Sequence, residues 1–360
     1  MSDFQTLHEL VKAARANLPD GTWDYLVGGA ETETTLLRNR QSLDSLAFRS
    51  RVLRDVTKVH CTSTFLGKPM RMPVFLAPLG SLHALEPGGA MSAAKAAESF
   101  GILSVLSSVA QPGLEEIAAG TRHPKIYQLY VRGDRAWVEN HIHRAIAGRY
   151  VGFCFTVDTA IYGRRERDII KRYTPNARRT ATGFEFQATM TWELVSWFKA
   201  RFPKLPLILK GIVTAEDAAQ AVQHGVEVVY ISNHGGRQLD HSPGAIEVLQ
   251  EVVGAVGGKA EVVIDGGFMR GLDVLKAIAL GAKAVGIGKL YGLALAGGGE
   301  AGVSRALELL EMEIGLGLGL LGVSRLEELN PSYIRPAVPV YRPHTLYNAF
   351  PFLDLPESRY

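Results

Sequence analysis

A histidine and an arginine follow an apolar run closely enough to act on one small molecule. Residues 226–231 are apolar and predict a buried strand, after which Gly235-Gly236 turns the chain between His234 and Arg237. An imidazole can accept a proton near neutral pH, and a guanidinium can bind a carboxylate through two parallel hydrogen bonds. This pair suits proton removal from a substrate that carries a carboxylate, such as a 2-hydroxy acid. Taken alone, His234 fits a structural histidine in a polar loop better.

The strand before His234 belongs to a repeating pattern. Short apolar, β-branched runs alternate with helical stretches, for example 88–100, 134–147, 214–224 and 270–280. The runs are almost continuously apolar, as expected of parallel strands that are covered on both faces. Eight such units predict an α/β protein with a closed (β/α)8 TIM barrel; a doubly wound open sheet fits less well, because no GxGxxG follows the first strand. The eight runs are 73–77, 102–106, 126–130, 153–157, 206–210, 227–231, 261–265 and 284–288.

Polar and ionisable residues follow these runs, where the active site of such a barrel lies. Gln128 and Tyr130 are two residues apart and so should share a face of their strand. The other residues at this rim, strand by strand, are Ala77, Pro78, Leu79 and Gly80; Ser107 and Ser108; Thr156, Asp158, Arg164 and Arg165; Lys210; Ser232, His234 and Arg237; Asp265, Gly266 and Gly267; and Gly286, Gly288 and Lys289.

The last two strands end in glycines, which predicts a phosphate site. Glycines let backbone N–H groups approach an anion, and a following helix presents its positive N-terminal end. Arg270 and Lys289 would supply cations to this site. The same glycines could instead form ordinary tight turns.

The barrel, expected over residues 73–300, lies in one domain that spans 1–360. Residues 1–60 predict a helical N-terminal extension, in which Tyr25 is a candidate pocket residue, and residues 301–360 predict a helix and a tail. The connection 166–190 is long for a barrel loop. It fits either a mobile lid or a solvated excursion.

Composition excludes several classes of protein. The formal net charge of +3 is too small to indicate nucleic-acid binding. Cys61 and Cys154 show no CxxC spacing, so we expect no metal site, and Cys154 should be a buried thiol. No signal-peptide pattern and no run of 18 apolar residues occurs, so a cytoplasmic protein without membrane insertion is expected.

The motifs together resemble those of the FMN-dependent 2-hydroxy acid oxidising family, which includes glycolate oxidase, lactate oxidase, mandelate dehydrogenase and the flavin domain of flavocytochrome b2. The resemblance covers residues 5–350. It is carried by residues 232–240, Gln128-Leu129-Tyr130, residues 156–159, Gly163-Arg164-Arg165-Glu166, Leu209-Lys210-Gly211 and Asp265-Gly266-Gly267.

The resemblance implies a role for each site residue and FMN as the cofactor. His234 would be the base and Asp158 would stabilise its protonated form; Tyr130 would bind the substrate oxygen. Lys210 would stabilise negative charge on the reduced flavin. Arg165, Arg237 and Tyr25 would bind the substrate carboxylate. Gln128, Thr156, Ser107, Ser232 and the backbone near Ala77 would hold the flavin ring and ribityl groups, while Gly267, Gly288 and Lys289 would meet the phosphate. Further cofactor-binding candidates are Pro78, Leu79, Asp265, Gly266, Met269 and Arg270.

Three departures from the family pattern bear on cofactor and substrate. Met269 and Lys289 stand where the family usually has arginines, so we expect the FMN phosphate to be either held more weakly or cradled differently. Gly80 replaces an alanine common in oxidases. Together with Val109, which replaces a bulkier aromatic residue, it favours a larger substrate such as mandelate.

The expected activity is oxidation of an L-2-hydroxy acid to the 2-keto acid, with oxygen or another acceptor reoxidising the flavin. The alternatives are a flavin-dependent isomerase on a related barrel and a catalytically silent, ligand-binding relative. The resemblance also implies a homo-oligomer, specifically a tetramer.

Overall fold

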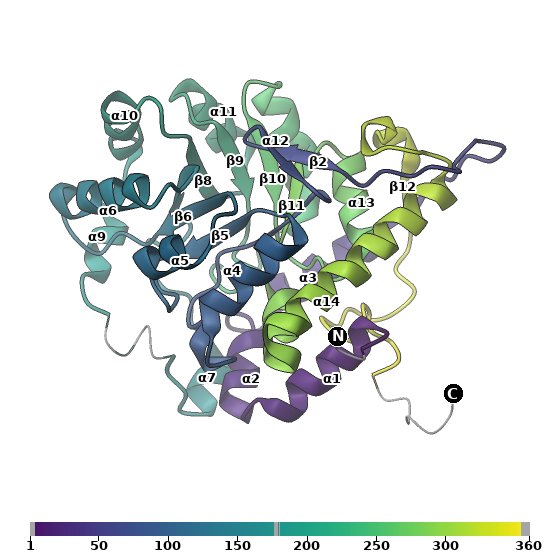
Figure 1. Ribbon diagram of the computed structural model, residues 1–360, viewed down its shortest axis with the longest axis horizontal. Coiled ribbons are helices and arrows are strands. Elements are labelled where there is room, and N and C mark those ends of the chain that lie inside the picture. Colours follow the sequence, from purple (N-terminus) through teal and green to yellow (C-terminus); the bar gives the residue numbers. More distant parts are fainter. Residues whose placement is uncertain (1–3, 176–178, 180, 354–360) are drawn as a thin grey trace.

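Eight parallel strands form the predicted closed barrel at the centre of the molecule (Figure 1). The computed structural model describes residues 4–175, 179 and 181–353. Around the barrel the strands follow the order β10-β11-β4-β5-β6-β7-β8-β9. Each predicted strand is confirmed, with its ends within two residues of the expected ones. The strands are β4 (Val74–Leu76), β5 (Ser104–Ser107), β6 (Lys125–Leu129), β7 (Gly152–Thr156), β8 (Leu207–Ile212), β9 (Val228–Ile231), β10 (Glu261–Ile264) and β11 (Ala284–Ile287).

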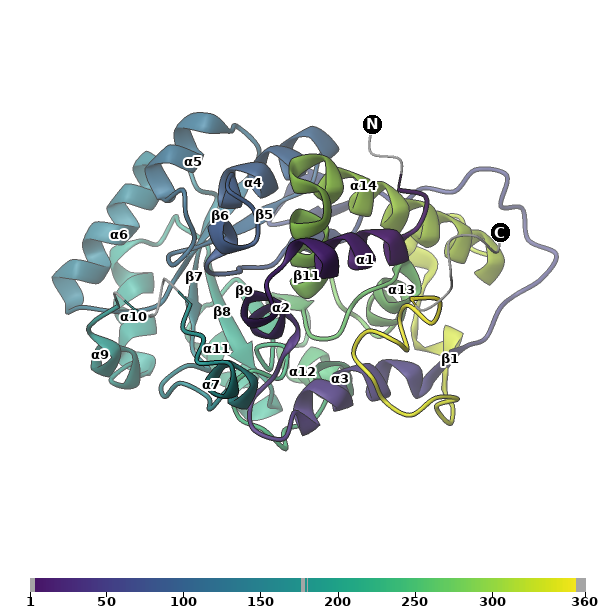
Figure 2. The same cartoon turned by 90° about the horizontal axis from the view of Figure 1, so that it is seen from below.

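Helices cover the outside of the barrel, and the four stretches expected to be helical are confirmed (Figures 1 and 2). Local sequence explains where they begin and end: Asp134 and Thr214 cap two of them by accepting hydrogen bonds from the Trp137 and Asp217 amides. The helices after the barrel strands are α4 (Gly89–Phe100), α5 (Leu114–Gly120), α6 (Arg135–Ala147), α7 (Glu166–Ile170), α9 (Phe184–Ala188), α10 (Trp192–Arg201), α11 (Ala215–Gln223), α12 (Leu249–Val256), α13 (Gly271–Ala279) and α14 (Lys289–Leu321), with short 3-10 turns at Leu82–Ala84 and Ala245–Val248.

The interior of the barrel is filled with side chains. Phe75 and Tyr230 pack edge to face across it, with ring centroids 5.5 Å apart. A Cβ on Gly286 would lie 2.5 Å from the Tyr230 hydroxyl, so only glycine leaves room for these rings. Phe65, in the hairpin of β2 (Ser63–Phe65) and β3 (Lys68–Met70), packs against Phe75 with the ring centroids 5.3 Å apart. Cys154 lies fully buried in this core, as expected.

The N-terminal extension packs onto the last helix. It contains α1 (Leu7–Asn17), α2 (Asp20–Val27) and α3 (Thr34–Asp44), and α1 lies along α14 (Figure 2). Element α14 consists of two helices joined across a kink, because Gly298 and Gly299 leave helical geometry. The second helix follows Gly299, close to the predicted start at residue 301, whereas the first, which begins at Lys289 directly after β11, was not predicted.

The long connection after β7 is partly docked on the barrel. Gln187, in α9, accepts a hydrogen bond from the Val131 amide at 2.7 Å and donates one to the Thr156 carbonyl at 2.6 Å. These bonds tie α9 to the ends of β6 and β7, so this part is not a solvated excursion. Residues 176–178 and 180, which the expected lid includes, lie outside the described residues.

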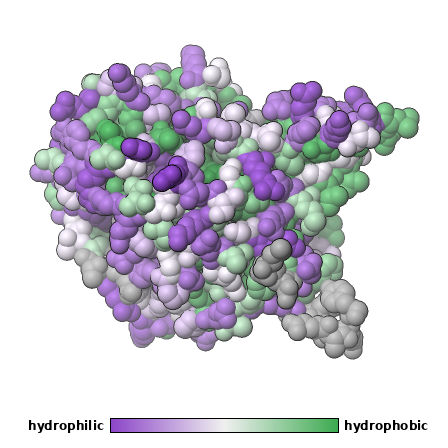
Figure 3. Space-filling model, in the orientation of Figure 1, coloured by the Kyte–Doolittle hydropathy of each residue, from purple (hydrophilic) through white to green (hydrophobic). Residues whose placement is uncertain are grey.

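Peripheral strands complete the chain. Strands β1 (Leu46–Phe48) and β12 (Ile334–Pro336) pair antiparallel, and 3-10 turns form at Leu326–Glu328 and Pro331–Tyr333. Between β1 and β2 the chain extends away from the barrel, where Val52 and Leu53 are exposed and the surface is hydrophobic (Figures 1 and 3). Among the described helices, none is both long and apolar enough to cross a bilayer.

Candidate active site

A cavity opens at the carboxyl ends of the barrel strands, where the sequence places its polar residues. It encloses roughly 1050 Å³ of space, part of it continuous with solvent. Seventeen of the predicted site residues line it: Tyr25, Ala77, Pro78, Leu79, Gly80, Val109, Tyr130, Arg165, Lys210, His234, Arg237, Asp265, Gly266, Gly267, Met269, Gly288 and Lys289.

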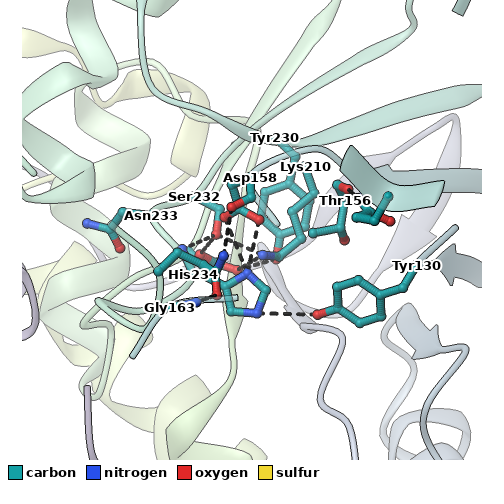
Figure 4. Close-up of polar contacts among 12 residues, drawn as sticks. Tyr130, Thr156, Asp158, Gly163, Lys210, Tyr230, Ser232, Asn233 and His234 are labelled. Carbon is teal, nitrogen blue, oxygen red and sulfur yellow. Dashed lines mark hydrogen bonds and ion pairs between the residues drawn. The ribbon is translucent and has the colours of Figure 1, made fainter. Parts of the chain in front are cut away.

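His234 lies between a carboxylate and a phenol (Figure 4). Its Nδ1 is 3.1 Å from Asp158 Oδ1, and its Nε2 is 3.3 Å from the Tyr130 hydroxyl. Because an ionised carboxylate only accepts, Asp158 selects the tautomer with hydrogen on Nδ1 and leaves Nε2 as an acceptor. His234 has a φ of +57°, and Gly235 and Gly236 follow with φ of +64° and +75°. This left-handed turn directs the imidazole into the cavity.

The surroundings keep His234 neutral. Burial lowers the pKa of His234 below its ordinary value of 6.5; Asp158 opposes this shift, and Lys210 adds to it. For Asp158, burial would raise the pKa of the carboxyl, but His234 and Lys210 outweigh burial and lower that pKa. At neutral pH the site therefore holds an ionised Asp158 and an unprotonated His234 that can accept a proton.

Lys210 is fixed at the floor of the cavity. Its ammonium donates to the Ser232 hydroxyl at 2.9 Å and lies 3.9 Å from Asp265 Oδ2. Asp265 in turn accepts hydrogen bonds from Ser232 at 2.6 Å and from Tyr230 at 2.9 Å. Tyr230 thus joins the apolar interior to this polar layer, and the network holds the Lys210 charge in one position (Figure 4).

Two guanidiniums face the cavity from different segments. Arg165 is 6% exposed, and its Nε has no hydrogen-bond partner among the described residues. Arg237 donates to the backbone carbonyls of Tyr25 and Gly28 at 2.6 and 2.9 Å, which fixes the end of α2 over the cavity. Burial and the nearby Arg165 lower the pKa of Arg237 to about 10, so both groups are charged at neutral pH. Two buried like charges favour an anion between them.

The residues predicted to hold a phosphate lie at the ends of β10 and β11. Gly266 and Gly267 have φ of +107° and +87°, and a Cβ on Gly267 would lie 3.0 Å from Asn39. Lys289 begins α14, and its ammonium donates to the carbonyls of Val27 and Gly28 at 3.0 and 3.3 Å. Burial and Arg237 lower the pKa of Lys289 well below its ordinary value. An anion beside Lys289 would reverse that shift.

Three buried polar atoms of the barrel wall have no partner among the described residues: both amide atoms of Gln128 and Oγ1 of Thr156. Both residues are 0% exposed. Buried polar groups normally find a partner, because an unmade hydrogen bond costs about 1–3 kcal/mol. These atoms are therefore suited to a polar ligand.

Six predicted residues do not line the cavity. Asp158 and Ser232 act through His234 and Lys210, and Gln128 and Thr156 are buried in the strands. Ser107 is also buried, 3.4 Å from the Val109 amide. Arg270 requires a correction: its guanidinium pairs with Glu313 at 2.6 Å and donates to the Ala349 carbonyl, so this cation is engaged on α14 and the tail.

The cavity also contains residues that the sequence did not reveal. Tyr162 lines it directly before the Gly-Arg-Arg motif, and the Arg165 guanidinium lies 4.8 Å from its ring centroid. The signal in the sequence that could have indicated Tyr162 is its place three residues before Arg165, a candidate substrate-binding arginine. Thr345 reaches the cavity from the C-terminal tail, far from any motif. No local pattern could have indicated that contact.

Comparisons with known proteins decide the family. The model of the FMN-dependent dehydrogenase family matches residues 14–336. The chain belongs to this family. It is an oxidoreductase, and FMN is its cofactor.

Named members of the family resemble the chain over almost its whole length. L-lactate oxidase of Nostoc sp. is 37% identical over 357 residues, covering 91% of this chain and 97% of that protein. Glycolate oxidase of Spinacia oleracea is 37% identical over 354 residues, covering 92% and 96%. A soluble mutant of the membrane-associated (S)-mandelate dehydrogenase from Pseudomonas putida has a TM-score of 0.88 at 33% identity, covering 93% and 100%. Mandelate oxidase has a TM-score of 0.86 at 37% identity, covering 94% and 100%.

The residues present fit FMN. The flavin ring carries hydrogen-bond donors and acceptors, and the unpartnered atoms of Gln128 and Thr156 can bond to them. Lys210 offers the cation that a reduced flavin favours, and Lys289 with the glycines of β10 and β11 offers the cradle that a phosphate favours. The family assignment and the cavity therefore agree on the cofactor.

Proposed function

We propose that this protein oxidises an L-2-hydroxy acid to the corresponding 2-keto acid. The observation that carries the proposal is that a neutral imidazole, two guanidiniums and an ammonium, from the segments after β7 and β9 and from β8, line one cavity. The relatives named lactate oxidase, glycolate oxidase and mandelate oxidase support the substrate class.

The geometry gives each residue a task in this reaction. Arg165 and Arg237 bind the substrate carboxylate and so fix its α-carbon in the cavity. The Tyr130 hydroxyl, 3.3 Å from His234 Nε2, places the substrate oxygen near the base. His234 accepts the proton at Nε2, and Asp158 stabilises the imidazolium that forms.

Bound FMN supplies the two-electron acceptor for the reaction. Gln128, Thr156, Ser107, Ser232 and the backbone from Ala77 to Leu79 would hold its ring and ribityl groups, and Gly267, Gly288 and Lys289 would hold its phosphate. Lys210, fixed by Ser232, stabilises the negative charge that accumulates when the cofactor is reduced.

The side of the cavity at β4 and β5 favours a bulky substrate. A Cβ on Gly80 would lie 2.8 Å from Val109 Cγ2, so alanine would fit only if Val109 moved. Val109 therefore fills the space beside Gly80, and only its small size compared with an aromatic residue leaves room for a substrate side chain. This, together with the relatives named mandelate dehydrogenase and mandelate oxidase, supports an aryl substrate such as mandelate.

A substrate panel tests the proposed function. Purified enzyme loaded with FMN would be assayed with glycolate, L-lactate, L-mandelate and D-mandelate, using oxygen and an artificial electron acceptor in parallel. We expect a 2-keto acid from L-substrates, with L-mandelate preferred over glycolate. Failure to oxidise any member with either acceptor would contradict the proposal and favour a silent relative.

Two further expectations accompany this function. A cytoplasmic location remains a prediction, and so does assembly into a homo-oligomer. The exposed Val52 and Leu53 at the extended segment would suit a contact between subunits. Light scattering of the purified protein measures the assembly.

A further inference from the structure

Beyond the catalytic residues, two further spaces adjoin the active-site cavity. The nearer space is lined by Tyr25, Val109, Tyr130 and Tyr162, all of which also line the active-site cavity. Arg132, Tyr162 and Phe184 line both this space and an outer one that is open to solvent. The three spaces are neighbours that share walls, and we call this series of spaces, from the reacting centre to Arg132, the passage.

Arg132 is held in place at this passage. It follows β6, and the amide of its neighbour Val131 donates to Gln187. Gly183, with a φ of +71°, packs on the Arg132 backbone so closely that a Cβ would lie 2.3 Å from the Arg132 carbonyl oxygen. The Arg132 guanidinium carbon lies 3.8 Å from the centroid of the Phe184 ring. Stacking on one face leaves the N–H groups at the edge of the guanidinium to bind an acceptor.

One N–H group of the Arg132 guanidinium has no partner within the described part of the protein. Its Nε is buried there without a hydrogen-bond partner. Burial lowers the pKa of Arg132, and the opposing effect of Glu185 is smaller. A partly buried guanidinium without an acceptor favours an anionic ligand. Neither the substrate carboxylate, which Arg165 and Arg237 bind, nor the cofactor accounts for this group.

We propose that Arg132 is a specificity-determining residue that binds a second carboxylate, at the far end of the substrate side chain. The substrate class is then a 2-hydroxy acid with an acidic side chain, whose apolar part passes Val109 and Tyr162. This inference rests on the proposed function and deepens it. The reaction itself is unchanged, because the second carboxylate takes no part in it.

The test compares acidic substrates with uncharged partners of similar length. L-malate, L-2-hydroxyglutarate and L-2-hydroxyadipate would be paired with L-2-hydroxybutyrate, L-2-hydroxypentanoate and L-2-hydroxyhexanoate, and a carboxymandelate with L-mandelate. We expect at least one acidic member to exceed its partner about tenfold or more in kcat/KM. That preference should be lost in Arg132→Met, mainly through a higher KM for the acidic member, while the uncharged partner changes less than about threefold.

Arg135→Met is the matched control, because Arg135 is an exposed arginine that stacks on Trp197 away from the cavity. Arg132→Lys provides a second variant if Arg132→Met does not fold, and it should keep part of the preference. Lack of preference for any acidic substrate, or a preference that both Arg132 variants retain, would overturn the inference. Oxidation of L-mandelate or L-lactate in the same assay would show that the proposed function survives such a result.

Discussion

His234 is a residue whose two nitrogens face different partners, and its pKa makes the reaction depend on pH. The unprotonated form is the base, and burial lowers the pKa of His234 below 6.5. We therefore expect kcat/KM to rise with pH and to level off before neutral pH, with the midpoint below 6.5. A pH profile measured with a saturating acceptor checks this. A midpoint above 7 would mean that the Asp158 carboxylate dominates the environment of the histidine.

Arg165 offers a clean test of the carboxylate clamp, because its sequence neighbour serves as control. Arg165→Met removes a buried charge that faces the cavity, and we expect kcat/KM to fall about 10- to 1000-fold, since a charge-assisted bond contributes about 1.5–3 kcal/mol and more when buried. Arg164 is exposed and pairs with Glu166 at 3.2 Å. Arg164→Met should change kcat/KM less than about twofold, and equal losses in the two variants would argue against the clamp.

Lys289 should make FMN binding depend on pH. Only the charged ammonium attracts a phosphate, and burial lowers the pKa of Lys289, so FMN affinity should fall as pH rises into the alkaline range. Lys289→Arg keeps its charge at these pH values and should bind FMN with a weaker pH dependence. Titration of the apoprotein with FMN, followed by the quenching of flavin fluorescence, measures the FMN affinity of the wild type and of the variant at each pH. The same pH dependence in wild type and variant would remove Lys289 from the phosphate site.

At the scale of elements, helix α3 is fastened to the loop that carries His234. Asp240 accepts hydrogen bonds from the Thr32 hydroxyl at 2.7 Å and from the Thr35 amide at 2.8 Å, and so caps α3 from a distant segment. Asn39 and Asn233 exchange two side-chain bonds of 3.0 and 2.8 Å. The motif following His234 therefore positions the N-terminal helices as well as the catalytic loop.

Removing this cap should lower stability. We expect Asp240→Ala to reduce the free energy of unfolding by about 1–3 kcal/mol, because it leaves several donors without a partner. Burial would raise the pKa of Asp240, but bonds from Thr35 and Thr32 outweigh it and lower that pKa. The stabilisation is thus present at neutral pH and fades only in strong acid.

Thermal unfolding at pH 7 checks the effect. Asp55→Ala is the control, because Asp55 is exposed and its carboxylate bonds, among the described residues, only to nearby Thr57. A melting temperature that falls equally in both variants would contradict a specific role for Asp240.

Across the whole molecule, periodicity predicted the barrel, whereas contacts between distant segments could not be predicted. Each strand is short, apolar and bounded by turn residues, so its position follows from local sequence. The glycines Gly298 and Gly299 interrupt α14 as the sequence suggests, but the helix that precedes them, from Lys289, was not predicted.

In the site, too, local sequence predicts some residues, whereas others depend on contacts between distant segments. His234, Lys210 and Arg165 follow strands, and a barrel gathers strand ends at one rim, so topology alone brings them together. Arg270 was expected at the phosphate by its place in sequence, but Glu313 on α14 binds it. Arg132 and Thr345 reach the site through tertiary packing, which leaves no periodic signal.

Anaerobic reduction of the bound cofactor tests the central claim most directly. Enzyme loaded with FMN would be mixed with an L-2-hydroxy acid without oxygen, and loss of the visible flavin absorbance followed in wild type and His234→Gln. The account predicts rapid bleaching in the wild type, and bleaching slowed about 100-fold or more in the variant, with FMN content unchanged. A wild-type protein that keeps its colour with every substrate, or a variant that bleaches at the wild-type rate, would contradict it.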